Sequence, residues 1–493
     1  MTKTWRYVSH KHKGIIITKS LIFTVADNLL TLLTVVLMLG CLRTRRVSRF
    51  FFLSLCVILA LALPHAGLAD TPAPKFDSGD TAWMMISTAL VLLMLIPGLA
   101  LFYGGMVSKE SVLGVLAQSF AVCCLISVLW VIYGYSFAFT AGPNLYIGGA
   151  SRIMLTGMGP KSVSSLASTI PESVYVMFQL TFAAITCALV LGSVATRIKF
   201  SSMLVFMAAW FTLVYIPIAH WVWGDHGWLG GTNIDKYPGL FGLGTTLDFA
   251  GGTVVHINAG IAGLVAALVM GKGYDFDKRR RNTPPYNIGL SLTGAALLWV
   301  GWFGFNAGSA VTSGDRAGMA MLVTHIATAA AGISWTAVEW MHSKKPTVLG
   351  IISGAVAGLV AITPASGFVD VTGALYIGAI AGVCCYLATR IKYKFDFDDT
   401  LDVFGVHCVG GIIGAILTGV FAVESIGGTK GALEGNINQV YVQILSVGVT
   451  VVYCGMVSYV ILKLINATMG LSLSESDQRI GLDQTQHGEM IHG

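Results

Sequence analysis

The chain has 493 residues and a formal net charge of +6 at pH 7. A soluble protein of this length would have about three domains and roughly 25% charged residues. Here only 11% of the residues are charged, 55% are hydrophobic and the mean hydropathy is +0.75. Because a soluble fold cannot bury so much apolar surface, the composition excludes that class and predicts an all-α polytopic membrane protein.

Common motifs for zinc binding, nucleotide binding and hydrolysis are absent from the sequence. The nine cysteines form no CxxC pair and no Cys/His cluster with zinc-ligand spacing, so we expect no metal and no cofactor. There is no GxxxxGK[ST], HExxH or GxSxG string either. ATP-driven pumping and the common hydrolase reactions therefore have no support, and we do not expect an enzyme.

The N-terminal region has the pattern of a signal peptide at 42–69. Four arginines lie within residues 43–49, an apolar stretch covers 50–63, and Gly67-Leu68-Ala69 is a small-residue cleavage site. We therefore predict cleavage after Ala69. Residues 1–41 precede this pattern and are interpreted either as an over-extended start site, which we favour, or as an extra membrane anchor.

Residues 70–467 form the predicted membrane domain, because they contain eleven apolar segments. A helix needs about 20 apolar residues to cross the bilayer. The segments are 81–106, 112–139, 173–195, 200–222, 249–271, 286–309, 317–340, 348–365, 369–390, 403–423 and 438–466. A cleaved signal peptide leaves the mature N-terminus outside. An odd number of crossings then places the tail, 468–493, in the cytoplasm.

The charges of the loops agree with this orientation. The loops assigned to the inside carry Lys109, Arg197, Lys199, Lys272, Lys278, Arg279, Arg280, Arg281, Lys344, Lys345, Arg390, Lys392 and Lys394. The loops assigned to the outside carry Arg152, Lys161, Lys236, Arg316 and Lys430. Thirteen basic residues inside against five outside follow the positive-inside rule.

The fifth and tenth segments share a short repeated pattern of an Asp followed by a His. The fifth opens with Asp248 and has His256 one to two turns inside; the tenth opens with Asp402 and has His407. Segments five apart cross the membrane in opposite directions. The repeated pattern therefore predicts inverted five-helix repeats, with the substrate site near the membrane midplane.

Three histidines lie inside predicted spans, where an ionisable group is costly and usually faces a partner or a cavity. We pair His256 with His407, because two neutral imidazoles can satisfy each other with one N–H donor and one acceptor. We interpret His325 as a helix-contact residue. The alternative is that each histidine bonds separately to Ser, Thr or backbone.

Aromatic residues share helix faces on two segments. Phe178 and Phe182 are i,i+4 on the third, while Trp302, Phe305 and Ser309 share one face of the sixth. Aromatic faces attract a cation by about 0.5–2 kcal/mol, and a hydroxyl adds an oxygen acceptor. The alternative is that these are ordinary membrane aromatics.

Two further residues lie at the outer boundary. Trp223 closes the fourth segment, where it suits either a cation site or an interfacial aromatic belt. Asp248 begins the fifth helix, so it either caps backbone N–H groups or binds a cation directly.

These residues lie in strings that resemble the ammonium transporter (Amt/Mep/Rh) family, and the bacterial Amt branch most of all. The strings are YIPIAHWVW at 215–223, DFAGGTVVHIN at 248–258, GWFGFNAGS at 301–309, DVFGVH at 402–407 and GLDQTQHGE at 481–489. The resemblance runs from about Trp83 into the tail. Leu180 is a departure, since relatives are expected to have Gly or Met there.

The resemblance implies a homotrimer of eleven-helix subunits in a bacterial inner membrane, each subunit with its own pore. The residues that match the outer ammonium site and its surroundings are Phe182, Trp223, Ser309, Phe178, Tyr215 and Asp248. Those that match the pore gate are Phe182, Phe305 and Trp302, and those that match the lumen are His256 and His407. The tail resembles a segment that couples subunits and docks a PII-type signalling protein.

The implied function is ammonium transport across the cytoplasmic membrane. NH4+ is recruited outside and deprotonated, and NH3 passes through a hydrophobic twin-histidine pore with separate proton transfer. An NH3 channel without proton coupling uses the same residues and stays open as an alternative. A second alternative is an ammonium sensor that signals through a cytoplasmic partner.

Overall fold

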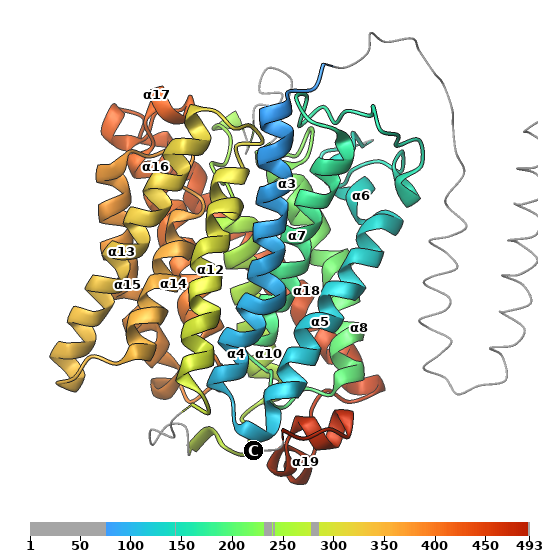
Figure 1. Ribbon diagram of the computed structural model, residues 1–493, viewed down its shortest axis with the longest axis vertical. Coiled ribbons are helices and arrows are strands. Elements are labelled where there is room, and N and C mark those ends of the chain that lie inside the picture. Colours follow the sequence, from blue (N-terminus) through green and yellow to red (C-terminus); the bar gives the residue numbers. More distant parts are fainter. Residues whose placement is uncertain (1–74, 143, 231–238, 240–241, 278–284, 492–493) are drawn as a thin grey trace, which may run out of the picture. The chain divides into compact units, whose positions relative to one another are not determined.

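The computed structural model describes residues 75–142, 144–230, 239, 242–277 and 285–491 (Figure 1). The predicted signal peptide at 42–69 and the extension 1–41 lie outside the described residues. Within the described residues the secondary structure is helical, apart from turns and isolated bridges such as the one between Ile198 and Ser472.

The helices follow the predicted segments. The first six are α3 (Ser78–Leu93) with η1 (Met94–Leu99) and α4 (Ala100–Met106); η2 (Lys109–Ser111), α5 (Val112–Leu129), η3 (Trp130–Gly134) and α6 (Tyr135–Phe139); α7 (Glu172–Leu191); α8 (Phe200–Trp210), η5 (Phe211–Tyr215) and α9 (Ile216–Trp223); η7 (Gly252–Ile257) and α10 (Asn258–Met270); and α12 (Ile288–Gly308). The others are α13 (Asp315–Ser343), α14 (Val348–Ile362), α15 (Val371–Lys394), η8 (Phe404–Cys408) with α16 (Val409–Phe421), and α18 (Asn438–Thr468). Short helices lie outside them: η4 (Ile153–Leu155), α17 (Glu424–Gly427), η9 (Ala432–Glu434), α19 (Glu475–Ile480) and η10 (Asp483–His487).

Ten of these helical segments, of 18 to 31 residues, are long and apolar enough to cross a membrane. The eighth predicted segment is shorter in the structure, because α14 has 15 residues and gives way to turns at Thr363, just before Pro364. At about 1.5 Å per residue it spans roughly 22 Å, so its role as an eleventh crossing stays a prediction. The prediction of an all-α polytopic membrane protein is confirmed.

Five of the spans contain a π-helical turn, namely η1, η3, η5, η7 and η8. Pro97 lies within η1 and has no N–H to donate. The turns η7 and η8 carry His256 and His407, each at the start of its helix. Such single turns are frequent at functional sites, and here they place the two histidines in equivalent positions of two helices.

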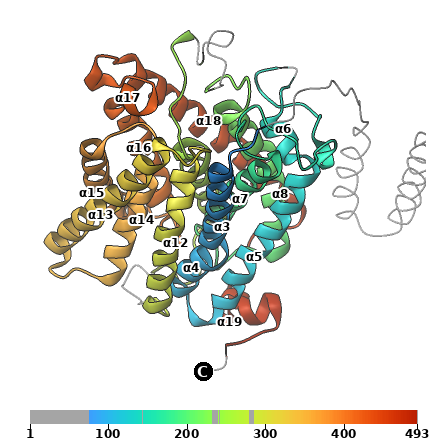
Figure 2. The ribbon, with the colours of Figure 1, turned by 45° about the horizontal axis from the view of Figure 1, so that its top comes forward.

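Small residues let α12 approach α3 closely, and both views show these two helices side by side (Figures 1 and 2). A Cβ on Gly304 would lie 2.7 Å from Leu90 Cβ and 2.7 Å from the Ser87 carbonyl oxygen. Glycine is thus required for the present separation of the helices. α3 also packs against α7, so α3 lies in contact with both α7 and α12.

We expect Gly304→Ala to destabilise the protein by about 1–3 kcal/mol, because the added methyl overpacks the α3–α12 contact. Thermal unfolding in detergent measures the effect. Gly318→Ala on α13 is the matched control, since a Cβ there meets no heavy atom within 4 Å; it should be neutral or stabilising by about 0.5–1 kcal/mol. Equal melting temperatures for the two variants would contradict the prediction.

The segment after α18 packs against the ends of several helices. Asp483 Oδ1 accepts a hydrogen bond from the Gly114 N–H of α5 at 2.7 Å, and the His487 ring lies edge-on to the Phe200 ring of α8 at 5.1 Å. Burial raises the pKa of the Asp483 carboxyl, and the Gly114 N–H opposes that rise. The tail is therefore anchored to the helices α5 and α8 by specific contacts.

Candidate functional site

Aromatic rings from α7, α9 and α12 converge near the ends of α9 and α12, on the side that the sequence predicts to face outward, and form what we call the outer cluster. The Phe178 and Phe182 rings of α7 are buried, with centroids 4.9 Å apart. Trp223 at the end of α9 meets Phe182 edge-on at 5.8 Å. Phe305 of α12 stacks on Phe182 with centroids 4.1 Å apart and an interplanar angle of 19°. The structure thus brings the predicted gate pair into direct contact.

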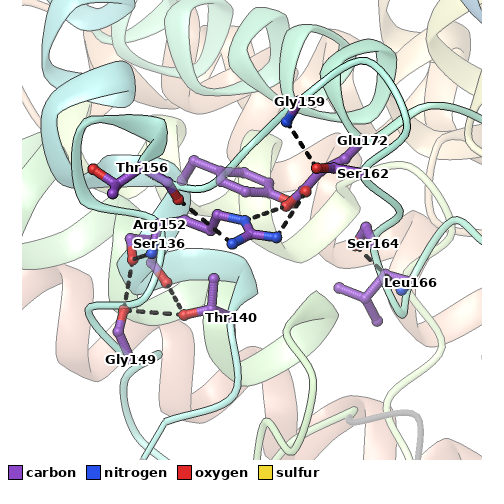
Figure 3. Close-up of polar contacts among 11 residues, drawn as sticks. Ser136, Thr140, Gly149, Arg152, Thr156, Gly159, Ser162, Ser164, Leu166 and Glu172 are labelled. Carbon is purple, nitrogen blue, oxygen red and sulfur yellow. Dashed lines mark hydrogen bonds and ion pairs between the residues drawn. The ribbon is translucent and has the colours of Figure 1, made fainter. Parts of the chain in front are cut away.

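The start of α7 is held by an ion pair from the preceding loop (Figure 3). Arg152 donates from Nε to Glu172 Oε1 at 2.9 Å and from its second terminal nitrogen to Oε2 at 3.1 Å. The Tyr135 hydroxyl also donates to Glu172 Oε1, at 3.1 Å. Because Glu172 is the first residue of α7, this bidentate contact anchors the helix that presents both phenylalanines.

Ser309 follows the last residue of α12, and its hydroxyl donates to the Phe305 carbonyl at 2.8 Å. The oxygen lone pairs remain available to accept from a cation's N–H groups. The loop beyond it is fastened to α3, because Asp80 Oδ1 accepts from Ser313 N at 2.8 Å and from Ser313 Oγ at 3.0 Å. Sequence reasoning missed Asp80, since nothing local relates it to a residue more than two hundred positions away.

Tyr215 ends η5 and is fully buried. Among the described residues its ring contact is with Phe211, at 5.9 Å and 17°. It lies on the same span as Trp223, but it is not in ring contact with the outer cluster.

Asp248 connects the outer cluster with the start of η7. The Trp223 indole N–H donates to its backbone carbonyl at 2.7 Å. Its carboxylate, in a residue only 5% exposed, accepts from four backbone N–H groups. These belong to Gly251 (3.0 Å), Gly252 (2.5 Å), Thr253 (3.0 Å) and Val254 (3.0 Å).

Four donors occupy about all the acceptor positions of a carboxylate, so the geometry favours capping over direct cation binding for Asp248. Burial raises the pKa of Asp248 to about 6, and the four N–H groups oppose that rise. The turn itself requires glycine: Gly251 has a φ of 110°, and a Cβ there would lie 2.4 Å from a methyl group of Val255.

The two histidines meet below the gate pair. His256 Nδ1 and His407 Nδ1 are 3.3 Å apart, and the rings are nearly parallel at 20° with centroids 5.3 Å apart. Both side chains are buried. Trp302 stacks on His256 at 5.4 Å and also contacts Phe305 at 5.4 Å. It therefore lies between the gate pair and the histidines, with its indole N–H donated to Thr363 Oγ1 at 2.9 Å.

His256 and His407 line a small cavity. Its lining residues are Met94, Leu99, Phe102, Ile185, Leu189, Val255, His256, Leu298, Trp302, Phe305, Val356 and His407. Apart from the two imidazoles and the indole, the lining side chains are hydrocarbon or thioether. The site thus consists of an aromatic cluster, the stacked Phe182–Phe305 pair, and two imidazoles in an apolar chamber.

Comparison with known proteins assigns the chain to a family. The model of the Ammonium Transporter Family matches residues 82–492. The chain belongs to the ammonium transporter family. An ammonium transporter of Aquifex aeolicus is 47% identical over 421 residues, which cover 85% of this chain and 94% of the relative. One of Bacillus subtilis is 44% identical over 417 residues, with 84% and 98% covered.

Solved structures agree with this assignment to the ammonium transporter family. Saccharomyces cerevisiae Mep2 superposes with a TM-score of 0.74 at 32% identity, covering 83% of this chain and 97% of Mep2. A structure named Sensor Amt Protein has a TM-score of 0.74 at 25% identity, covering 83% and 98%. The predicted all-α membrane fold and the family are confirmed, while the eleventh crossing, the inverted repeats and the homotrimer stay predictions.

One sequence-based match in this family member needs correction. Asp402, which we paired with Asp248, has a left-handed φ of 59° and forms an ion pair with Lys392 at 2.7 Å. The capping role belongs to Asp399, whose carboxylate accepts from Val403 N at 3.2 Å and Phe404 N at 2.8 Å. The signal was present in the spacing, because Asp399 precedes His407 by the same interval as Asp248 precedes His256.

His325 of this ammonium transporter family member lies outside the chamber. Its side chain is exposed on α13, and its ring centroid is 5.4 Å from that of Trp299 on α12. The interpretation of His325 as a helix-contact residue agrees with this position. In the described ranges no group of three or more His, Cys, Asp or Glu residues is arranged to hold a metal ion.

Proposed function

We propose that this chain transports ammonium across the cytoplasmic membrane of a bacterium. The observation that carries the proposal is the spatial order of three groups of side chains. The outer aromatic cluster comes first, then the stacked Phe182–Phe305 pair, and then the histidine pair in an apolar chamber. The relatives named ammonium transporters support the choice of substrate.

The outer cluster suits a partly hydrated NH4+. The aromatic faces near Trp223 and Phe178 attract a cation by about 0.5–2 kcal/mol, and Ser309 contributes an oxygen lone pair. Tyr215 lies on the same span as Trp223, stacked on Phe211. Asp248 acts through its backbone and its cap, because its carbonyl orients the Trp223 indole.

Below the cluster, the chamber excludes a bare ion. An unpaired charge is far costlier than a neutral molecule in surroundings of hydrocarbon and thioether side chains, so NH4+ releases a proton near the Phe182–Phe305 gate, above Trp302, and NH3 enters. K+ has no proton to release and is rejected at this step. Substrate selection is therefore a proton-release step rather than a size filter.

The histidine pair matches a neutral guest. The bond between Nδ1 of His256 and Nδ1 of His407 requires a proton on one nitrogen and a lone pair on the other. The first imidazole then has an acceptor Nε2, and the second has a donor Nε2–H. NH3 both donates and accepts, so it can hydrogen-bond to each in turn, while the released proton crosses by a separate transfer.

The proposal extends to assembly and surroundings. We place the chain as a homotrimer in the inner membrane, with the signal peptide 42–69 removed, the mature N-terminus outside and the tail 468–493 in the cytoplasm. The excess of basic residues in the inside loops supports this orientation. Asp483 and His487 anchor the tail to α5 and α8, and the tail held in this way offers a surface for a PII-type regulatory protein.

An ammonium sensor is the second candidate, and the likeness to the structure named Sensor Amt Protein favours it. A sensor binds ammonium at the same outer cluster but does not pass it. Transport and sensing are thus separated by flux, not by binding.

The test is the current across proteoliposomes containing the purified protein after an ammonium pulse without a membrane potential, with a K+ pulse as control. We expect a saturable current with ammonium only. Internal alkalinisation above that of empty liposomes without current would replace coupled transport by an NH3 channel. Neither signal from correctly folded protein would remove transport and leave the sensor.

A further inference from the structure

Arg316 occupies an unusual place at the start of α13. Its guanidinium carbon lies 4.8 Å from the centroid of the Phe249 ring and 4.9 Å from that of Phe368. The two rings meet edge-on, with centroids 5.9 Å apart. Arg316 Nε also donates to the Gly367 carbonyl at 2.9 Å. Through Arg316, α13 therefore contacts both the segment of Phe249 and the segment of Gly367 and Phe368.

Phe249 is wedged between Arg316 and the turns that follow α14. Its N–H donates to the Pro364 carbonyl at 3.1 Å, and the next N–H, of Ala250, donates to the Thr363 carbonyl at 3.2 Å. A Cβ on Gly367 would lie 2.2 Å from the Phe249 ring. The ring therefore has backbone against one part of its surface and the guanidinium against another.

Phe249 directly follows Asp248, so whatever fixes the ring also fixes the Asp248 peptide. That peptide receives the Trp223 indole N–H through its carbonyl, and the carboxylate caps η7 through four bonds. The contacts run without a break from Arg316 to Phe249, to Asp248 and to Trp223.

We propose that Arg316 is a positioning residue of the outer cation site: it holds Phe249, and through it the Asp248 peptide, where that peptide orients the Trp223 indole. This inference rests on the proposed function, because it assigns the Trp223 region to cation binding. Arginine suits the role because a planar guanidinium covers ring faces while its N–H groups donate in the same plane, which an ammonium group cannot reproduce.

Electrostatics alone predicts the opposite effect of Arg316. A positive charge close to the outer loop opposes the approach of ammonium, so its removal would strengthen cation binding. Positioning predicts that its removal weakens binding. A lysine separates the two further, because it keeps the charge and loses the planar contact.

The experiment compares Arg316→Lys and Arg316→Gln with wild type, and uses Lys430→Gln as the control that removes a half-exposed charge paired with Glu424. Ammonium-evoked current is recorded against concentration in proteoliposomes. We expect both Arg316 variants to raise the half-saturating concentration about three- to tenfold, as the loss of one or two cation–π contacts implies. The maximal current should stay within about twofold, since the gate and chamber are untouched.

A wild-type half-saturating concentration in Arg316→Lys, or a lowered one in Arg316→Gln, would overturn the proposal. Hydrogen exchange of the backbone amides at 251–254 gives a readout that does not require transport. These amides should exchange faster in both Arg316 variants than in wild type and Lys430→Gln, and equal exchange would also overturn the proposal. Absence of both current and internal alkalinisation in wild type would instead refute the proposed function, and the exchange result would still test the role of Arg316.

Discussion

Asp248→Ala is expected to abolish the ammonium-evoked current, with a fall of at least about 100-fold. The substitution leaves four buried backbone N–H groups without an acceptor, each at a cost of about 1–3 kcal/mol. The η7 turn that carries His256 then loses its cap, and the peptide that orients Trp223 loses its anchor. Current in proteoliposomes measures the effect, with size-exclusion chromatography to confirm folded protein.

Asp248→Asn separates capping from direct cation binding. Its amide oxygen still accepts from one pair of N–H groups, while the NH2 group faces the other pair, so capping predicts an intermediate current. Direct cation binding predicts that Asn fails as completely as Ala, because the negative charge is gone. The matched control is Asp370→Ala, which removes a single bond from Asp370 Oδ1 to the Gly373 N–H of α15 at 2.8 Å. Wild-type current in Asp248→Ala would refute the role given to Asp248.

The second large effect is expected at the histidine pair. His256→Leu and His407→Leu should each lower the current at least about tenfold, because each removes the shared bond and leaves the remaining Nδ1 unpaired in an apolar chamber. The maximal current at saturating ammonium measures the loss. His325→Leu is the control, since that ring lies on the exposed face of α13 and should leave the current unchanged.

The double variant shows whether the two imidazoles act as one unit. If NH3 passes by exchanging bonds with both, His256→Leu with His407→Leu should be hardly worse than either single change. Independent effects that multiply in the double variant would mean that the two rings act separately. The Nδ1–Nδ1 contact predicts the first result.

Hydropathy alone located the membrane helices, and the physical reason is local. In a bilayer every backbone N–H and C=O must be satisfied within the protein, and a helix does so within each segment. An apolar stretch such as 438–466 therefore predicts α18 (Asn438–Thr468) without knowledge of its neighbours. The end of α14 was less accessible, because its last turn depends on the turns at 363–368 that pack against Phe249 and Gly252.

Part of the candidate site could also be predicted from the sequence. A histidine inside an apolar span is costly, so His256 and His407 stood out by residue type, and their family resemblance supplied the roles. Sequence reasoning chose Asp402 instead of Asp399 because a backbone conformation is not visible in a sequence. In the structure Asp402 has a left-handed φ of 59°, and Asp399 accepts the N–H groups of Val403 and Phe404. Equal spacing to the two histidines was the only sequence signal for Asp399.

The sequence by itself determined the membrane class, the helical segments and the residue types suited to a cation that can lose a proton. Only the tertiary structure decided which of them meet: Phe182 with Phe305, His256 with His407, and Arg316 with Phe249. Each contact joins helices or loops far apart in the chain. Periodicity specifies which face of a helix is apolar, whereas the close approach of small residues such as Gly304 sets which helix lies against that face.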